Sequence, residues 1–119
     1  MSRVLITAGG SGIGRAMGEA FAEAGHQVWV TDVNAASLAD LPDGWRGTAV
    51  DVTDEAGMQA LFAEIAGAWG GLDVLCANAG SAGPTALIED IALDDWRSCV
   101  SVNLEGAFLA AKFAAPMMK

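Results

Sequence analysis

Four short apolar runs alternate along the chain with longer segments whose apolar residues recur every three or four positions. The runs cover residues 3–7, 28–31, 47–52 and 72–77. Short apolar runs between turn residues are typical of buried strands, and the longer spacing is typical of helices that pack on one side. The alternation predicts an α/β fold, in which a doubly wound parallel sheet is covered by helices on both faces.

The helical segments have recognisable ends and apolar stripes. The first begins in a glycine turn, ends at Gly25 and has apolar positions at Ile13, Ala16, Met17, Ala20, Phe21 and Ala24. Asn34 can cap a short helix that continues through Leu41. Thr53-Asp54 caps a longer helix that ends at Gly70-Gly71 and has a stripe at Met58, Leu61, Phe62, Ile65, Ala66 and Trp69.

The last helix, from Leu93 to about Lys119, has two apolar stripes instead of one. The first stripe is Leu93, Trp96, Val100, Leu104, Ala107 and Ala111; the second is Cys99, Val102, Gly106, Leu109 and Phe113. A helix that is apolar on two sides is buried on two sides. We expect one stripe to cover the sheet and the other to pack against the rest of the protein or a second subunit.

Composition narrows the possible partners. A chain of 119 residues with 53% hydrophobic residues forms one domain with a moderate core. The formal charge of −9 argues against nucleic acid and anionic membrane surfaces as partners. Cys76 and Cys99 are expected to be reduced core thiols of a cytoplasmic protein, and with the single His26 they are too few for a metal site.

The stretch Thr7-Ala8-Gly9-Gly10-Ser11-Gly12-Ile13-Gly14 lies between the first strand and the first helix. Such a turn makes an anion site, because the first helical amides lack partners and glycines let a phosphate approach the backbone. The spacing does not fit G-x-G-x-x-G, but it fits T-G-x-x-x-G-x-G with alanine in the first glycine place. A methyl group at Ala8 is tolerated if its φ is negative. The alternative is a flexible turn of another α/β protein.

This spacing resembles the short-chain dehydrogenase/reductase family. The resemblance implies a Rossmann-type sheet, incomplete here, with four strands in the order 3-2-1-4 and about four helices. Residues 1–119 would be the NAD-binding half of a longer enzyme. It implies cofactor contacts at the glycine turn, at Ser11, Gly12, Ile13 and Gly14.

Asp32 ends the second strand, about 20 residues after the glycine turn, where a carboxylate can accept hydrogen bonds from ribose hydroxyls. It favours NAD over NADP, since it would repel a 2′-phosphate. The neighbouring places, Ser11 and Val33, carry no positive charge, and Arg15 lies inside the helix. Alternatively, Asp32 is simply a favourable charge at a helix N-terminus.

Two further strand ends match the family's motifs. Asp51-Val52 resembles its adenine-contacting pair, although Asp51 can also cap the following turn. Asn78-Ala79-Gly80 resembles its N-A-G motif, in which Asn78 would brace the central strands and Ala79 and Gly80 would line the cofactor ribose. Because carboxyl ends of parallel strands meet at one sheet edge, we expect Gly12, Asp32, Asp51 and Asn78 to gather around one crevice.

Asn103 resembles the family's catalytic asparagine, which would hold a water for a proton relay; alternatively its amide is satisfied by a neighbouring carbonyl. The family's catalytic serine and Tyr-x-x-x-Lys helix are missing, and the chain contains no tyrosine. We therefore expect the parent protein to be an NAD(H)-dependent oxidoreductase acting on a small secondary alcohol or ketone. This chain alone is expected to be inactive.

The alternative is a truncated, non-catalytic module that binds dinucleotide or assembles. In either case the fourth strand would form an exposed apolar edge of the sheet. We expect the missing carboxyl-terminal half or a second subunit to cover it. Family members commonly form homo-oligomers through the last helix, and the resemblance implies the same here.

Overall fold

The computed structural model describes residues 1–119 and contains one parallel sheet of four strands. The strands are β1 (Arg3–Ile6), β2 (Gln27–Asp32), β3 (Arg46–Ala49) and β4 (Val74–Cys76), and their order is β3-β2-β1-β4. Leu5 of β1 lies between Trp29 of β2 and Leu75 of β4. The predicted fold class and strand order are confirmed.

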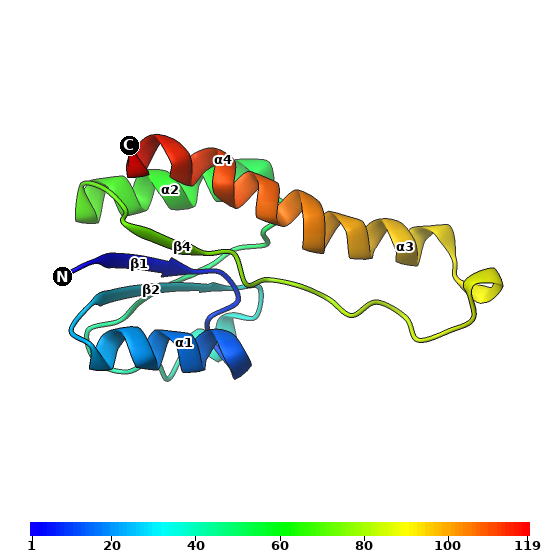
Figure 1. Ribbon diagram of the computed structural model, residues 1–119, viewed down its shortest axis with the longest axis horizontal. Helices are drawn as coiled ribbons and strands as arrows, with labels where there is room; N and C mark the ends of the chain where they lie inside the picture. The colour runs from blue at the N-terminus through cyan, green and yellow to red at the C-terminus, as the bar shows by residue number, and fades with distance from the viewer.

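Helices cover both faces of the sheet (Figure 1). Helix α1 (Gly12–Glu23) lies on one face, and α2 (Glu55–Trp69) and α4 (Gly106–Met118) lie side by side on the other. Successive side chains of a strand point to opposite faces. Leu5 and Trp29 therefore pack in the core under α2 and α4, whereas Val4, Ile6, Val28 and Val30 form a second core toward α1.

Strands β3 and β4 are shorter than their apolar runs predicted. The third run was expected over residues 47–52, but β3 ends at Ala49, and the chain then turns toward α2. The amide of Val50 still donates to the Asp32 carbonyl, and the amide of Asp54 donates to the Asp51 carbonyl in a turn. The bond from Asp54 to Asp51 closes a turn that ends the pairing of β3 with β2. Asp51 and Val52 therefore do not pair with another strand.

Helix ends agree with the sequence in part. Asn34 accepts a hydrogen bond from the Ala36 amide at 3.0 Å, as a cap should, but the helix that follows is a 3-10 turn, η1 (Ala35–Leu38), and stops short of Leu41. Asp54 immediately precedes α2, at the N-cap position, yet its side chain makes no capping hydrogen bond. Gly70 ends α2 with a left-handed φ of 75°.

Five predicted positions of the first two apolar stripes are exposed, namely Ile13, Ala16, Ala20, Ala24 and Ala66. Ile13 is 76% exposed, and α1 instead buries Gly14, which lies against Ala8, and Gly18, over which the Trp45 ring lies. Ala66 is also exposed, on the solvent side of α2. Gly14 and Gly18 allow α1 to approach its neighbours closely, so the helix packs through its backbone as well as through its apolar stripe.

The predicted last helix is continuous but not uniform. It consists of α3 (Leu93–Val100), a π-helical segment η3 (Ser101–Glu105) and α4. With the preceding loop and the 3-10 turn η2 (Ile88–Asp90), α3 forms an arm that projects beyond the sheet (Figure 1). We call residues 80–105 the arm. None of the residues from 73 to 105 is buried.

The two stripes of the last helix have different environments. Gly106 and Leu109 of the second stripe are buried against the protein, whereas Leu93, Trp96 and Leu104 of the first stripe are 57–67% exposed. One stripe therefore covers α2 and the sheet, as predicted, whereas Leu93, Trp96 and Leu104 of the other have no cover within the chain. Both cysteines are free and partly buried: Cys76 packs against the core toward α1, as expected, whereas Cys99 lies in the arm and is not a core residue. None of the helices combines the length and the hydropathy needed to cross a bilayer.

Candidate functional site

The glycine loop after β1 is tied to both neighbouring strands. The Gly9 amide donates to the Thr31 carbonyl of β2 at 2.8 Å. On the other side, the buried hydroxyl of Thr7 accepts from the amides of Asn78 and Ala79. The Asn78 side chain donates to the Ala8 carbonyl at 3.3 Å. Asn78 thus braces the loop against β4, in agreement with the bracing that the N-A-G motif implied.

Ala8 has a backbone conformation that the sequence analysis did not expect. Its φ is +54°, the only positive value at a residue other than glycine. The argument that a methyl group is tolerated there required a negative φ, and it is wrong. A left-handed conformation costs a residue with Cβ about 1–2 kcal/mol. The surrounding hydrogen bonds hold the loop in this conformation despite that cost.

Gly14 allows the beginning of α1 to lie directly on the loop. A Cβ at this position would overlap the Ala8 carbonyl oxygen and would lie 2.7 Å from Asn78 Nδ2. The first turn of α1 has no side-chain cap, since Ser11 makes no cap bond, and it has no acidic residue. Its first amides therefore have no hydrogen-bond partner within the chain.

A cavity of about 220 Å³ lies at the carboxyl edge of the sheet, and we call it the sheet-edge cavity. It contains residues from the ends of all four strands and from the π-helical segment. Its lining is Ala8, Thr31, Asp32, Val33, Val50, Asp51, Val52, Ala79, Gly80 and Val102. Six predicted cofactor residues are among them, namely Asp32, Val33, Asp51, Val52, Ala79 and Gly80.

The other predicted residues lie around this cavity. Ser11 and Gly12 line an adjoining pocket, described below, and Gly14 and Asn78 lie behind the cavity against Ala8. Ile13 points to solvent. Gly12, Asp32, Asp51 and Asn78 all lie at the carboxyl edge of the sheet, but only Asp32 and Asp51 line one cavity, so the expected gathering around one crevice is met in part.

The two carboxylates of the cavity each keep an oxygen available. Asp32 Oδ1 accepts from the Asn34 amide at 3.0 Å. Asp51 Oδ1 accepts from both the amide and the hydroxyl of Thr53, and these bonds lower the pKa of Asp51 below its usual value. The turn-capping alternative for Asp51 is thus observed, but it uses only Oδ1. The second oxygen of each carboxylate can accept a hydrogen bond from a ligand.

A more polar pocket of about 470 Å³ lies beside the glycine loop, and we call it the loop pocket. Its lining is Gly10, Ser11, Gly12, Arg15, Asn34, Ala36, Ser37 and Asp40. A Cβ at Gly10 would lie 2.8 Å from Asp32 Oδ2, so the Asp32 carboxylate lies against the wall of the loop pocket as well as in the sheet-edge cavity.

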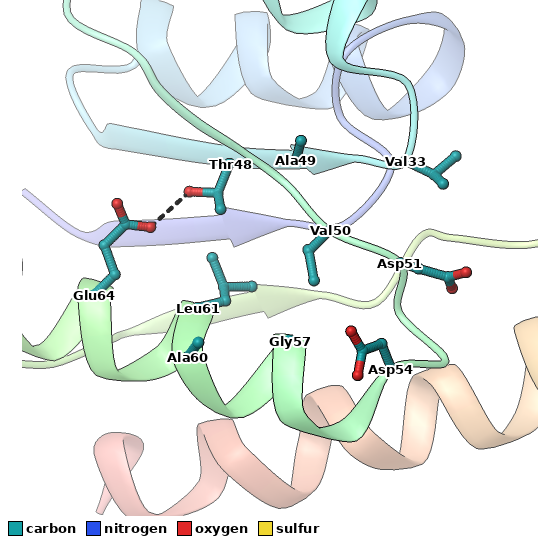
Figure 2. A pocket seen from close by; sticks show the side chains of 10 residues that line it. All are labelled: Val33, Thr48, Ala49, Val50, Asp51, Asp54, Gly57, Ala60, Leu61 and Glu64. Carbon is teal, nitrogen blue, oxygen red and sulfur yellow. Dashed lines mark hydrogen bonds between the residues drawn. The ribbon is translucent and has the colours of Figure 1, made fainter.

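The largest hollow, about 740 Å³, is an open groove between β3 and α2 (Figure 2). It shares Val33, Val50 and Asp51 with the sheet-edge cavity. Its polar wall includes Glu64, which accepts from the Thr48 hydroxyl at 2.8 Å. It contains no residue of the glycine loop, β4 or the last helix, so of the strand-end features that converge on the smaller cavity it has only Val33, Val50 and Asp51.

Asn103 lies in the π-helical segment, next to Gly80. Its amide nitrogen donates to the carbonyls of Ser81 and Cys99, and its Oδ1 accepts from the Ser81 amide. The alternative interpretation, a side chain satisfied by neighbouring carbonyls, describes these contacts. The residue is nevertheless exposed, and π-helical turns are often found at functional sites.

Sequence reasoning did not single out Thr7, Thr31, Val50 and Val102. Thr7 was visible in the glycine stretch, but its link to Asn78 joins residues 71 positions apart. Val50 and Val102 were visible only as apolar positions of a strand and a helix. Thr31 Oγ1 is buried without a hydrogen-bond partner, which no sequence pattern indicates.

The carboxyl edge of the sheet has one region that suits a phosphate and another that suits a nucleoside, as a dinucleotide requires. The position of a Cβ at Gly12 is open space, with nothing within 4 Å, and the uncapped α1 amides suit a phosphate. The sheet-edge cavity is smaller than the 300–1,000 Å³ or so of a typical ligand pocket, which suits one nucleoside of a larger ligand. Apolar walls at Val33, Val52 and Val102 and two carboxylates suit an adenosine with its hydroxyl and amino donors.

A parallel sheet with a glycine turn and acidic strand ends defines a Rossmann-type fold. Residues 2–119 match the family model for short chain dehydrogenases. The chain belongs to the short-chain dehydrogenase/reductase family, a family of oxidoreductases.

Several characterised proteins are similar to the chain. A short chain dehydrogenase/reductase of Colletotrichum higginsianum is 40% identical, and the match covers 96% of this chain and 45% of that protein. D-threitol dehydrogenase of Mycolicibacterium smegmatis is 36% identical over 96% of this chain and 46% of the enzyme. The chain spans about half the length of these relatives.

Solved structures agree with the fold. The ligand-free aldohexose dehydrogenase of Thermoplasma acidophilum superposes with a TM-score of 0.90 at 31% identity, covering 98% of this chain and 44% of that one. A 3-ketoacyl-ACP reductase from Sinorhizobium meliloti also has a TM-score of 0.90, at 33% identity, covering 98% of this chain and 48% of the reductase.

Proposed function

We propose that this chain is the NAD(H)-binding half of a short-chain oxidoreductase that interconverts a small secondary alcohol and a ketone. The observation that carries the proposal is the sheet-edge cavity, where the ends of four strands bring apolar walls and two carboxylates together. Similarity to dehydrogenases of small alcohols and sugars supports the substrate class. The bound nicotinamide would supply hydride transfer, and the protein supplies binding and orientation.

Most of the predicted residues have a role in this proposal. Ser11, Gly12 and the α1 amides hold the pyrophosphate, and Asp32 accepts from the adenosine ribose. Asp51 accepts from the adenine amino group, and Val33 and Val52 pack on the ring. Ala79 and Gly80 line the second ribose. These assignments rest on the match with the family's motifs and on the oxygens and apolar surface present at the edge.

Asn103 contributes to the catalytic set in this proposal. Its side chain makes two hydrogen bonds with Ser81 and two with Cys99, and so holds Ser81 in place. The side-chain amide is thus engaged, and we assign Asn103 to fixing the loop that follows β4 beside the nicotinamide end of the site.

Turnover needs groups that this chain does not hold. The chain contains no tyrosine, so it cannot complete the tyrosine-based proton relay of the family by itself. We therefore propose that the 119-residue chain binds the cofactor without turnover, and that the whole protein carries the activity. Appearance of NADH absorbance from this chain alone with a secondary alcohol would contradict this.

Asp32 provides the direct test of cofactor choice. In Asp32→Ala, NAD⁺ binding should weaken about tenfold, because a charge-assisted hydrogen bond contributes about 1.5 kcal/mol or more. Discrimination against NADP⁺ should relax at the same time. Calorimetric titration of both cofactors measures this, with the exposed Asp95→Asn as a charge-matched control on the arm. An unchanged preference would refute the role of Asp32.

The uncovered apolar stripe suggests the partner. Leu93, Trp96, Leu104 and the adjacent Phe108 are each more than half exposed. We propose that a second copy or the carboxyl-terminal half covers this stripe, and that the missing half covers the free edge of β4. Light-scattering mass of wild type and of a Trp96→Glu, Phe108→Glu variant tests self-association.

A further inference from the structure

The loop pocket contains one positive charge, Arg15, and that charge is held by acidic neighbours. Arg15 Nη1 lies 3.1 Å from Asp40 Oδ1, and Arg15 Nε lies 3.6 Å from Glu19. The side chain is only 24% exposed, whereas Asp40 is 80% exposed. The guanidinium is therefore fixed at the pocket wall, with its charge balanced by two carboxylates.

Main-chain atoms hold the guanidinium as well. Arg15 Nη2 donates to the Asp40 carbonyl at 3.1 Å, and Nη1 donates to the Gly10 carbonyl at 3.4 Å. These two acceptors do not depend on the Asp40 side-chain charge. Neutralising that carboxylate should leave the guanidinium in the loop pocket, where it would then be free to attract an anion.

Asp32 connects this pocket to the proposed cofactor. Its carboxylate lines the sheet-edge cavity, and its Oδ2 lies against Gly10 at the wall of the loop pocket. If Asp32 binds the adenosine ribose, the substituent on the ribose 2′-oxygen lies where the two cavities adjoin. Asn34 and Ser37 add polar side chains to the same pocket.

We propose that the Arg15–Asp40 ion pair, together with Asp32, decides whether the adenosine end of the cofactor can carry a 2′-phosphate. This inference rests on the proposed function. With Asp40 in place, a 2′-phosphate at the loop pocket meets Asp32 and Asp40 against a single guanidinium, whose charge Glu19 also offsets, and the dianion is repelled. Asp40 is thus a specificity-determining residue: it keeps Arg15 from serving as a phosphate-binding residue.

The test compares two single-charge variants in the full chain. Asp40→Asn should tighten NADP⁺ binding by roughly three- to tenfold, the size expected for one charge at a partly exposed site, and leave NAD⁺ within about twofold. Asp43→Asn is the matched control, because Asp43 is an exposed carboxylate nearby that lies outside the pocket and its loss changes the net charge equally. It should alter neither affinity.

Two further measurements identify the cause. Adding Arg15→Gln to Asp40→Asn should abolish the gain for NADP⁺. Titration with AMP and with adenosine 2′,5′-bisphosphate isolates the phosphate, and the gain should shrink as salt rises, since about 0.15 M salt screens exposed charges beyond about 8 Å. Circular dichroism of each variant shows that it is folded.

The outcomes separate the two proposals. If wild type binds NAD⁺ and the two aspartate variants change NADP⁺ affinity equally, general charge explains the effect and the inference is overturned. It is also overturned if Arg15→Gln leaves the gain intact. If folded wild type does not bind NAD⁺ at all, the proposed function fails first, and this inference fails with it.

Discussion

The central strands and the arm are built in opposite ways. Residues 4–7 and 28–31 are all buried, and their backbone is paired on both sides or tied to the loop that follows. In the arm, residues 80–105, no residue is buried, and Leu87, Ile88, Leu93 and Trp96 are each more than half exposed. The first region buries its apolar side chains within the chain, whereas the second leaves several of them exposed.

The difference shows which parts of the fold this chain completes by itself. Apolar surface removed from water stabilises a fold by about 25 cal/mol per Å². The central strands gain that energy from α1, α2 and α4, all present in the chain. The exposed apolar residues of the arm have no such cover within this chain. The sheet-edge cavity lies where the two regions meet, at Ala79, Gly80 and Val102.

Truncating one leucine in each region tests this contrast most strongly. Leu5→Ala should lower the free energy of unfolding by about 2–5 kcal/mol, because Leu5 is fully buried in the core under α2. Leu104→Ala, at a residue 67% exposed, should change it by no more than about 0.5 kcal/mol. Urea unfolding of the dilute protein measures both. Similar losses would mean that the arm is covered after all.

Two glycine substitutions sharpen the contrast within helices. Gly14→Ala should destabilise the protein by about 1–3 kcal/mol, since the new methyl group would overlap Ala8 and Asn78. Gly67→Ala, in α2, has nothing within 4 Å and should stabilise by about 0.5–1 kcal/mol. Thermal unfolding distinguishes the signs. A neutral Gly14→Ala would disprove the close approach of α1 to the loop.

Ala8→Gly should remove the strain at the loop. The substitution should raise the free energy of unfolding by about 1 kcal/mol, because glycine adopts a positive φ without the Cβ clash. Ala63→Gly, at an exposed position of α2, is the control and should lower it by about 0.8–1 kcal/mol. If both substitutions destabilise, Ala8 does not hold the left-handed conformation in solution.

The smallest effect concerns the end of the sheet away from the cavity. Asp73 accepts three hydrogen bonds from Arg3, which lower its pKa to about 2. This folded-state pKa lies below the ordinary 3.8. The Arg3–Asp73 ion pair therefore contributes its full stabilisation of the folded protein above about pH 4, and this contribution is lost as the pH falls toward 2. Between pH 6 and pH 2, the unfolding midpoint of Asp73→Asn should fall less than that of the wild type. Asp95→Asn should retain the wild-type drop.

Much of the fold was predictable because its signals are local. The apolar runs of β1 and β2, the helix stop at Gly70 and the cap at Asn34 depend on neighbouring residues, and all are confirmed. The ends of β3 and β4 were overestimated, since an apolar run does not reveal where pairing stops. Ile13 was misplaced because helical spacing cannot show which face meets the sheet when the close contact is made by Gly14 and Gly18.

The sequence alone determined the alternation of strands and helices, the strand order through the family resemblance, and the acidic and glycine residues at the strand ends. These follow from periodicity and turn chemistry, which act between residues close in the chain. Tertiary structure decided the positive φ of Ala8, the π-helical turn around Asn103 and the pairing of Arg15 with Asp40. Each of these depends on contacts between distant segments, whose distances and angles are set only when the sheet and its helices pack together.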